Sequence, residues 1–335
     1  MIDRFTGCIL GQAVGDALGF PVEGRSSEQT TAAVAPFPRE FTPHPCGLFP
    51  PGQYTDDTQM MRAILTSLVE RGQVNAEDIA ARFASLWREG EIVGRGRATT
   101  AAVQRLMAGV SWRESGTPAP SAGNGSAMRT APLGLWFYDD PVALARAAAD
   151  VSCITHADPR CLAGAVAISA AVAYGVSHDA IDADPFICFV ADLARPYHAG
   201  GLEQSAFAAL IETLPHWLEM DEAAAVQEIR HAGLPPGRRP DWPGISPFVV
   251  PTVLVCLYAF LRTPADYGET VRFVIAQGGD VDTTGAIAGA ISGAFNGIEA
   301  VPESLARSVT DRGRHGYESL RALAERLWAL KHSPQ

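Results

Sequence analysis

Hydrophobic side chains recur with helical spacing along most of the chain. In MMRAILTSLV (60–69) they follow the i, i+3, i+4, i+7 spacing of an amphipathic helix. Strict apolar–polar alternation is scarce, so the pattern predicts an all-α protein. The segments with helical patterns are 57–71, 76–89, 98–108, 142–150, 158–176, 202–213, 221–231, 247–262, 268–277, 284–295 and 302–330.

Two of the predicted helices are rich in alanine and glycine, namely 163–173 and 284–297. Glycine in a helix interior costs roughly 1 kcal/mol relative to alanine, so its repeated use indicates that other backbones approach closely there. These segments are therefore predicted to be central helices. No composition break marks a boundary, which predicts one large helical domain over 1–335, with 331–335 as a tail.

The charge balance excludes several function classes. The net charge is −11, and a protein that binds the phosphate backbone of nucleic acids normally carries a basic surface, so no general nucleic-acid binding is expected. The one lysine is Lys331, near the end of the chain. A P-loop and a Schiff-base site both need a lysine in the site, so neither is expected.

The cysteines and the apolar runs bear on the compartment. None of the six cysteines forms a C-x-x-C pair, which argues against a thiolate zinc site, and most lie in apolar runs. The first apolar run is interrupted by Gln12 and Asp16, unlike a secretory signal. The run 248–261 is too short to span a bilayer and contains Pro251. We expect a cytoplasmic protein with no membrane segment.

Two distant segments each combine two carboxylates with threonine at the start of an apolar run. They are QYTDDTQM (53–60) and GGDVDTTGAIAG (278–289). Helix capping explains one hydroxyl or carboxylate in each segment. A cation site explains the complete set, because four carboxylates in one cleft would repel each other without a metal. The six oxygen donors are Thr55, Asp56, Asp57, Asp280, Asp282 and Thr283.

The donor set favours particular metals. Because it contains oxygen ligands and no His or Cys, it points to Mg²⁺ or Mn²⁺ and away from Zn²⁺. Two ions about 3.5–4 Å apart can share such a set and orient a water against a substrate. The sequence alone does not show that the two segments meet in space, so capping and metal binding both stay open at this point.

Five segments in order give the chain a resemblance to a known family. It resembles the ADP-ribosylglycohydrolases, which include the dinitrogenase-reductase-activating glycohydrolases and the mammalian ADP-ribosyl-acceptor hydrolases. The similar segments are GCILGQAVGDALGFPVEG (7–24), YTDDTQM (54–60), GNGSAMRTAPLGL (123–135), THADPRCLAGAVA (155–167) and GGDVDTTGAIAGAISGAFNG (278–297).

The resemblance implies a fold, a reaction and a cofactor. The fold is a single large orthogonal helical bundle, and the cofactor is a pair of Mg²⁺ ions, with Mn²⁺ as an alternative, held by the six donors named above. The reaction is hydrolysis of the bond from ribose C1 to a protein side chain or small acceptor, which releases ADP-ribose. The catalytic candidates are Glu23, Asp56, Asp57 and Asp282.

The resemblance also marks two glycine loops and a histidine as substrate-binding candidates. Their ordinary interpretations are turns and a buried structural histidine. Backbone N–H groups of such loops can approach phosphates closely. The candidates are Gly94, Gly96, Gly123, Asn124, Gly125, Ser126, Met128 and His156.

Other candidates have a weaker basis in the sequence. Without the resemblance, Glu23 would be interpreted as a solvated acid in a loop. Asp16 is expected to form hydrogen bonds at a helix end and not to take part directly in the reaction. Some family members place an acid just before the first glycine loop, where this chain has Val93, with Glu91 nearby. Aromatic residues that could stack on adenine are Phe20, Tyr54, Phe137 and Tyr138.

Two other functions remain possible at this point. A binuclear-metal nucleotide phosphohydrolase would use the same oxygen ligands for displacement at phosphorus. An inactive ADP-ribose-binding or structural family member would keep the fold without the reaction. The expected partner is an ADP-ribosylated protein or small molecule, and no obligate protein partner is inferred. The acceptor linkage and the oligomeric state are not readable.

Overall fold

The computed structural model describes residues 1–197, 206–234 and 242–333, and all regular structure in these ranges is helical. It confirms the predicted all-α class. The helices are α1 (Ile2–Gly19), η1 (Phe20–Val22), α2 (Ser27–Val34), α3 (Asp56–Arg71), α4 (Ala76–Arg88), α5 (Arg97–Met107), α6 (Trp112–Ser115), η2 (Asn124–Arg129), α7 (Ala131–Trp136), α8 (Pro141–Cys153), α9 (Pro159–Ser177), α10 (Ala183–Ala194), α11 (Ala206–Ile211), α12 (Leu214–Glu219), α13 (Glu222–His231), α14 (Val249–Arg262), α15 (Tyr267–Ala276), α16 (Val281–Asn296), η3 (Ile298–Ala300), α17 (Glu303–Ser308) and α18 (Tyr317–Lys331).

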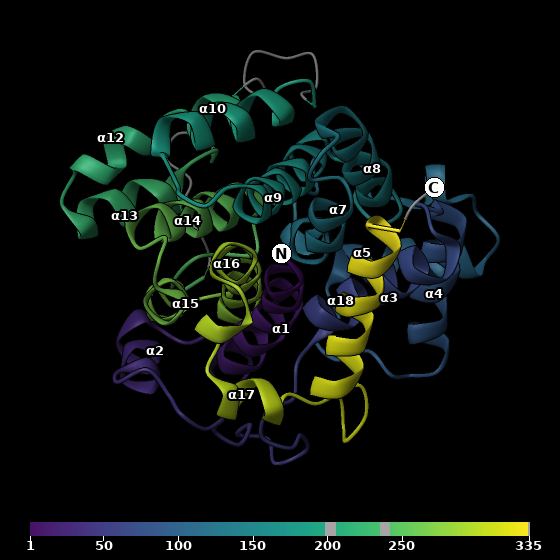
Figure 1. Cartoon of the computed structure of the whole chain (residues 1–335), viewed down its shortest axis with the longest axis horizontal. Coiled ribbons are helices and arrows are strands. Elements are labelled where there is room, and N and C mark those ends of the chain that lie inside the picture. The colour runs from purple at the N-terminus through teal and green to yellow at the C-terminus, as the bar shows by residue number, and fades with distance from the viewer. Residues whose placement is uncertain (198–205, 235–241, 334–335) are drawn as a thin grey trace.

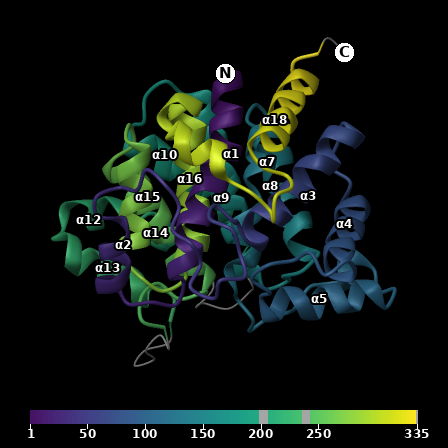
Figure 2. The same cartoon turned by 90° about the horizontal axis from the view of Figure 1, so that it is seen from below.

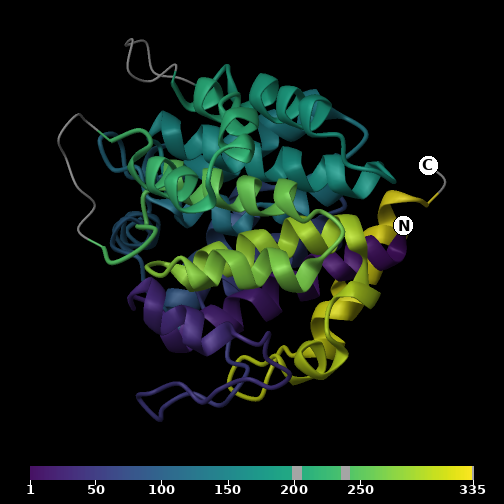
Figure 3. The same ribbon diagram turned by 90° about the vertical axis from the view of Figure 1, so that its left-hand side faces the viewer.

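Helices α1 and α16 lie side by side at the centre of the molecule, and the remaining helices are arranged around them (Figure 1). On one side, α9 and α14 pack against α16, with α10, α12 and α13 further out. On the other side lie α18, α3 and α4, with α5 along one edge (Figure 2). The segment between α2 and α3 lies on the outside of the helical body (Figure 3).

The contact between α1 and α16 is made by two rows of glycines. Gly7 and Gly11 each face the other helix so closely that a Cβ atom would lie 2.5 Å from the carbonyl oxygen of Gly293 or Gly289, respectively. Real Cβ atoms do not approach an oxygen this closely, so only glycine allows the two backbones to meet at this distance. The predicted central position of the segment 284–297 is confirmed, because α16 is buried from Val281 to Ala294.

Most of the predicted helices are present within two or three residues of their expected ends, and a few differences have physical causes. The segment 302–330 was predicted as one helix and forms two, because 309–316 turns back on itself. There Arg312, Gly313 and His315 have positive φ angles of 51°, 80° and 48°. The predicted tail is also too long, since Lys331 belongs to α18. Of the predicted helix 202–213, residues 202–205 lie outside the described part.

Helix α1 was not predicted, because its sequence has no apolar stripe. Nearly the whole of it is buried, from Phe5 to Gly19. A helix that is surrounded on all sides does not need a polar face, so its composition carries no 3.6-residue period.

In the described part of the chain, α9 is the one helix long and apolar enough to cross a membrane by length and composition. Of its most apolar window, 83% is buried inside the fold. Its apolar character is therefore accounted for by its place among α7, α8, α10 and α16.

The glycine contact makes a stability prediction. Replacing Gly289 by alanine puts a methyl group against the carbonyl group of Gly11. We expect Gly289→Ala to lower the free energy of unfolding by about 3 kcal/mol, since overpacking of this kind forces backbone shifts. Urea denaturation followed by circular dichroism measures the change.

The matched control is Gly268→Ala in α15. A Cβ atom at Gly268 would meet its nearest neighbour, Asp266 Oδ1, at 3.5 Å, an ordinary van der Waals distance. This variant gains helix propensity, so we expect it to be neutral or up to about 1 kcal/mol more stable. Equal losses in both variants would contradict the proposed role of the α1–α16 contact.

Candidate functional site

Asp16, near the end of α1, fixes the start of α3. Its carboxylate accepts hydrogen bonds from the backbone N–H of Thr55 at 2.9 Å and of Thr58 at 3.1 Å, and from both threonine hydroxyls at 3.0 and 2.6 Å. Asp16 is fully buried, and these bonds provide its partners. The expectation that Asp16 acts through hydrogen bonds at a helix end agrees with this geometry. The result is that Asp56 and Asp57 are held at the N-terminus of α3.

The start of α16 is fixed by a close crossing of three chain segments. Gly24 donates to the carbonyl oxygen of Gly279 at 2.8 Å, and Gly279 donates to that of Arg25 at 2.9 Å. Gly279 has a φ of +87°, and a Cβ atom there would lie 2.6 Å from the nitrogen of Ile245, so glycine is required. This crossing places the Glu23 loop against the N-terminus of α16.

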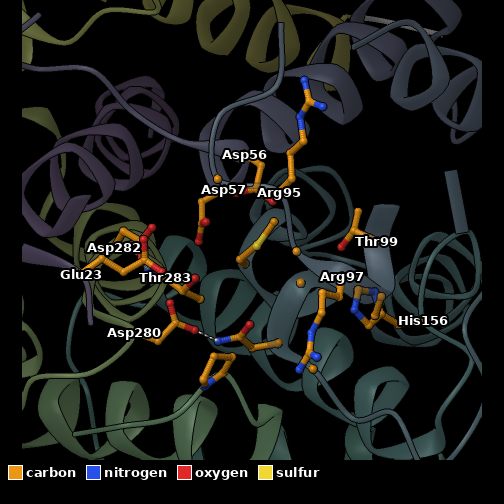
Figure 4. Close-up of a pocket in the computed structure, with 18 of the residues that line it drawn as sticks. Glu23, Asp56, Asp57, Arg95, Arg97, Thr99, His156, Asp280, Asp282 and Thr283 are labelled. Atoms are coloured by element: carbon orange, nitrogen blue, oxygen red, sulfur yellow. Dashed lines mark hydrogen bonds between the residues drawn. The ribbon is translucent and has the colours of Figure 1, made fainter. Parts of the chain in front are cut away.

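The two acid-threonine segments meet in space at one cavity, together with Glu23 (Figure 4). Ligand oxygens of Glu23, Asp280 and Asp282 lie within 4.8 Å of one another. Asp56 and Asp57 line the same cavity from α3. Five carboxylates from three separate segments therefore share one region, as the cation hypothesis requires.

Burial and mutual repulsion disfavour the charged forms of these acids. Desolvation, and then neighbouring carboxylates, raise the pKa of Asp56, Asp57 and Asp282 well above the usual range. The pKa of Glu23 rises to about 7, first because its carboxyl group is partly removed from water, although the residue as a whole is exposed, and then because of the charge of Asp280. Such a cluster is stabilised in its charged form by a cation.

Helix capping explains only part of the first segment. The Thr55 hydroxyl accepts from the backbone N–H of Asp57 at 3.4 Å, so Thr55 is the N-cap of α3. Asp280 is the N-cap of α16, but its side chain makes no capping bond. The Oδ1 atom of Asp57 is buried and has no hydrogen-bond partner among the described residues. Capping therefore leaves the carboxylates unexplained.

The residues present fit a hard divalent cation. The metal-ligand candidates that line the cavity are carboxylates and the Thr283 hydroxyl, which suit Mg²⁺ or Mn²⁺. No cysteine lies among the lining residues, and His156 lies on the side away from Glu23 and Asp282 (Figure 4). Asp280 is oriented by Asn124, whose Nδ2 donates to Asp280 Oδ2 at 2.7 Å. Thr55 differs from the other predicted ligands, because its hydroxyl is fully buried and bonds Asp16 and Asp57.

The cavity has a volume of about 470 Å³, a size typical of a small-molecule site. Gly94 and Gly125 allow the backbone to come close to functional side chains. A Cβ atom at Gly94 would lie 2.8 Å from Asp56 Oδ1, and one at Gly125 would lie 2.8 Å from His156 Cε1. The predicted substrate-binding residues that line it are Gly94, Gly96, Gly123, Asn124, Gly125, Met128 and His156.

Ser126 does not line the cavity. It is fully buried, and its hydroxyl donates to the carbonyl oxygen of Cys161 at 3.1 Å. Its side chain therefore has a structural contact, which holds the 3-10 helix η2 against α9. Other residues of this loop line the cavity, and the motif did not show which of its side chains point inward.

The aromatic candidates for adenine stacking lie elsewhere. Tyr54 is buried and donates to the carbonyl oxygen of His315 at 2.9 Å, while Phe137 and Tyr138 pack at the hydrophobic core. Phe20 lines a neighbouring cavity. Among the described residues, the Phe, Tyr or Trp that lines the main cavity is Trp242, in the Pro-rich segment 232–247, of which residues 235–241 lie outside the described part.

The sequence also missed several polar residues of the cavity. Arg95 and Arg97 belong to the glycine loop GRGR, and their alternation with the two glycines is the signal that was available. Arg97 and His156 lie on the side of the cavity away from Glu23 and Asp282 (Figure 4). The cavity therefore has an acidic end and a side that carries arginine. The remaining lining residues not predicted are Ala98, Thr99, Ser121 and Pro247.

His156 is held as a neutral ring. It is buried, and its Nδ1 bonds the Thr155 hydroxyl at 2.8 Å. Burial, reinforced by the charge of Arg129, lowers its pKa to about 3. At neutral pH His156 therefore offers one hydrogen-bond donor and one acceptor and carries no charge.

Comparisons with known proteins give consistent results along the whole chain. The sequence profile of the ADP-ribosylglycohydrolase family matches residues 1–335. An ADP-ribosyl-[dinitrogen reductase] glycohydrolase of Rhodospirillum rubrum is 29% identical over 96% of this chain and 97% of its own. The ADP-ribosylhydrolase ARH3 of Bos taurus is 28% identical over 97% of this chain and 92% of its own. A solved structure described as an ADP-ribosylglycohydrolase-related protein complex has 28% identity and a TM-score of 0.72, covering 98% of each chain.

The low pKa of His156 predicts an acid dependence of stability. The unfolded chain takes up a proton near the ordinary value of 6.5, whereas the folded state resists protonation down to about 3. Stability from this residue is therefore complete above pH 6.5 and is lost as the pH falls below it. Between pH 7.5 and 5.0 we expect His156→Gln to lose about 2 kcal/mol less free energy of unfolding than the wild type.

Urea denaturation at several pH values measures this difference. The exposed His216 provides the control, and His216→Gln should follow the wild-type pH dependence. Parallel curves for the wild type and His156→Gln would show that His156 is not held neutral.

Proposed function

Because the chain belongs to the ADP-ribosylglycohydrolase family, we propose that it hydrolyses the bond from ribose C1 of ADP-ribose to an acceptor and releases ADP-ribose. The observation that carries the proposal is the meeting of five carboxylates from three segments in one cavity of about 470 Å³. The opposite side of the same cavity carries Arg97 and the neutral His156 (Figure 4).

The polarity of the cavity suggests how the substrate lies. The diphosphate of ADP-ribose is anionic, so it is directed away from the carboxylates and toward Arg97 and the glycine loops. Backbone N–H groups at Gly96 and Gly125 can approach phosphate oxygens, since glycine has no side chain of its own to keep a ligand away. This orientation brings the ribose that carries the acceptor to Glu23, Asp56 and Asp282.

We propose that the site holds two Mg²⁺ or Mn²⁺ ions. Asp56, Asp57, Asp280, Asp282 and Thr283 line the cavity and would hold them, and Thr55 stays a predicted ligand. Bound metal would orient the ribose hydroxyls and a water molecule and would offset the crowding of negative charge. The unpartnered Oδ1 atom of Asp57 supports this assignment.

The reaction needs a proton at the leaving atom and a hydroxyl group at C1. The bond between C1 and the acceptor breaks, water supplies the hydroxyl group to C1, and the acceptor leaves with a proton. The transition state is positively charged at the sugar, and the carboxylates around it stabilise that charge. Glu23 is the exposed member of the acidic cluster, so it is the carboxyl group placed to exchange a proton with the acceptor or water.

The direct test is hydrolysis of defined substrates. We expect the protein to release ADP-ribose from mono-ADP-ribosylated arginine or serine in the presence of Mg²⁺ or Mn²⁺, and to stop when a chelator is added. Chromatography identifies the product. Release of AMP or phosphate would instead indicate the phosphohydrolase, and no product from either linkage would count against the proposal.

Substitution of the carboxylates tests their role. Asp56→Asn and Asp282→Asn keep the side-chain shape, so we expect folded proteins whose kcat/KM is lower by about 100-fold or more. We also expect Mg²⁺ to raise the melting temperature of the wild type more than that of either variant, because metal stabilises the state that binds it.

Asp179→Asn is the matched control, because the Asp179 side chain is fully exposed and pairs with Arg4 on the surface. It should retain wild-type activity and the wild-type response to Mg²⁺. Unchanged rates in Asp56→Asn and Asp282→Asn would overturn the assignment of the carboxylates.

A further inference from the structure

A second cavity, of about 410 Å³, adjoins the first. Glu23 is the one residue that lines both cavities, so this residue stands at their junction. The second cavity lies between the residues that follow α1 and the loop that joins α2 to α3. We call it the Glu23-side cavity, and its other lining residues are Phe20, Pro21, Arg25, His44, Pro45 and Cys46.

One wall of the Glu23-side cavity is aromatic and uncharged. The rings of Phe20 and His44 are 4.3 Å apart, and Phe49 packs edge-on against both. The backbone N–H of Cys46 donates to His44 Nδ1 at 3.2 Å, so a neutral His44 ring carries its proton on Nε2. Burial, and then the charge of Arg25, lower the pKa of His44 and favour this neutral form.

Arg25 brings a positive charge to this cavity without an acidic partner. In the described ranges its side chain makes no ion pair, although the chain as a whole carries a net charge of −11. Its backbone is fixed by the bond from Gly279, so the start of its side chain has a defined position. A guanidinium group of this kind is available to pair with a carboxylate of a bound molecule.

The loop that carries His44 also presents an apolar side chain to the outside. Leu48 is 80% exposed, the largest exposed fraction among the large hydrophobic side chains of the described residues. This loop lies on the outside of the helical body (Figure 3). A single exposed leucine is common on protein surfaces, so Leu48 is a contact to be tested and not by itself evidence of a docking surface.

We propose that the Glu23-side cavity binds the acceptor polypeptide, and that Arg25 pairs with an acidic residue next to the modified side chain. The inference rests on the proposed hydrolysis and extends it to the leaving group. ADP-ribose occupies the first cavity, so the acceptor has to leave on the other side of the bond that is cut. That bond lies at Glu23, and the Glu23-side cavity is the space that adjoins Glu23 there.

The charge of the Glu23-side cavity, and its continuity with the first cavity at Glu23, indicate which molecule binds there. The Glu23-side cavity offers an uncharged aromatic wall, prolines and one unpaired cation, which fits a peptide with a negative charge. A peptide with a basic residue beside the modification would meet Arg25 with like charge and bind more weakly.

The experiment compares two peptides that differ in one residue. Both carry ADP-ribose on the same side chain, in whichever linkage the enzyme hydrolyses, and the neighbouring residue is Glu in one and Lys in the other. We expect the wild type to favour the Glu peptide in kcat/KM by about threefold at low salt. We expect Arg25→Glu to reverse the preference to about threefold for the Lys peptide. High salt should reduce both preferences.

The ratio between the peptides does not depend on how much of a variant is folded. Arg39→Glu is the matched control, because Arg39 is an exposed arginine in the segment that joins α2 to α3 and lines neither cavity. It should keep the wild-type ratio. In a second comparison, Leu48→Ser should raise KM for both peptides by about threefold relative to a single ADP-ribosylated amino acid, whereas Val142→Ser, at a distant exposed valine, should not.

The outcomes of these experiments distinguish failure of the acceptor-binding proposal from failure of the proposed hydrolysis. If wild type and Arg25→Glu have the same ratio, or if only the ADP-ribosylated amino acid is cleaved, acceptor binding at the Glu23-side cavity is wrong while the proposed hydrolysis stands. If none of the substrates releases ADP-ribose, the proposed function fails and the inference fails with it.

Discussion

The close contact between α1 and α16 is the constraint on which the rest of the structure depends. Gly11 and Gly289 face each other with no room for a methyl group, and neighbouring glycines repeat this along both helices. The contact brings the end of α1, with Asp16 and the Glu23 loop, to the start of α16. A wider spacing between the two helices would separate these groups and with them the whole acidic cluster.

The second constraint is electrostatic, and it works against stability. Four hydrogen-bond donors from Thr55 and Thr58 satisfy the buried carboxylate of Asp16, although burial still raises its pKa to about 7. The carboxylates of Asp57 and Asp282 accept fewer hydrogen bonds, and burial raises their pKa well above the usual range. A fold that gathers such groups without a cation maintains an unfavourable arrangement, which is typical of a site organised for a ligand rather than for stability.

In the proposed reaction, the nucleotide binds in the main cavity and the acceptor binds in the Glu23-side cavity. Carboxylates occupy one end of the main cavity, and Arg97 and the neutral His156 occupy the far side (Figure 4). Glu23 stands where the second cavity begins. The nucleotide and the acceptor would therefore approach the same bond from two directions, each meeting a surface of different charge.

The sequence by itself determined the helical class, most of the helices and the paired carboxylates, because periodicity and residue chemistry are local properties. It also determined, through its motifs, most of the residues that line the cavity. Only the tertiary structure decided that Asp56 and Asp282 share one site, that Thr55 and Ser126 turn toward buried partners, and that Trp242 reaches the cavity. It also decided that α1 is a helix, since a fully surrounded helix shows no apolar stripe. These features depend on contacts between segments far apart in the chain, and no local pattern specifies which distant backbone will supply the neighbour.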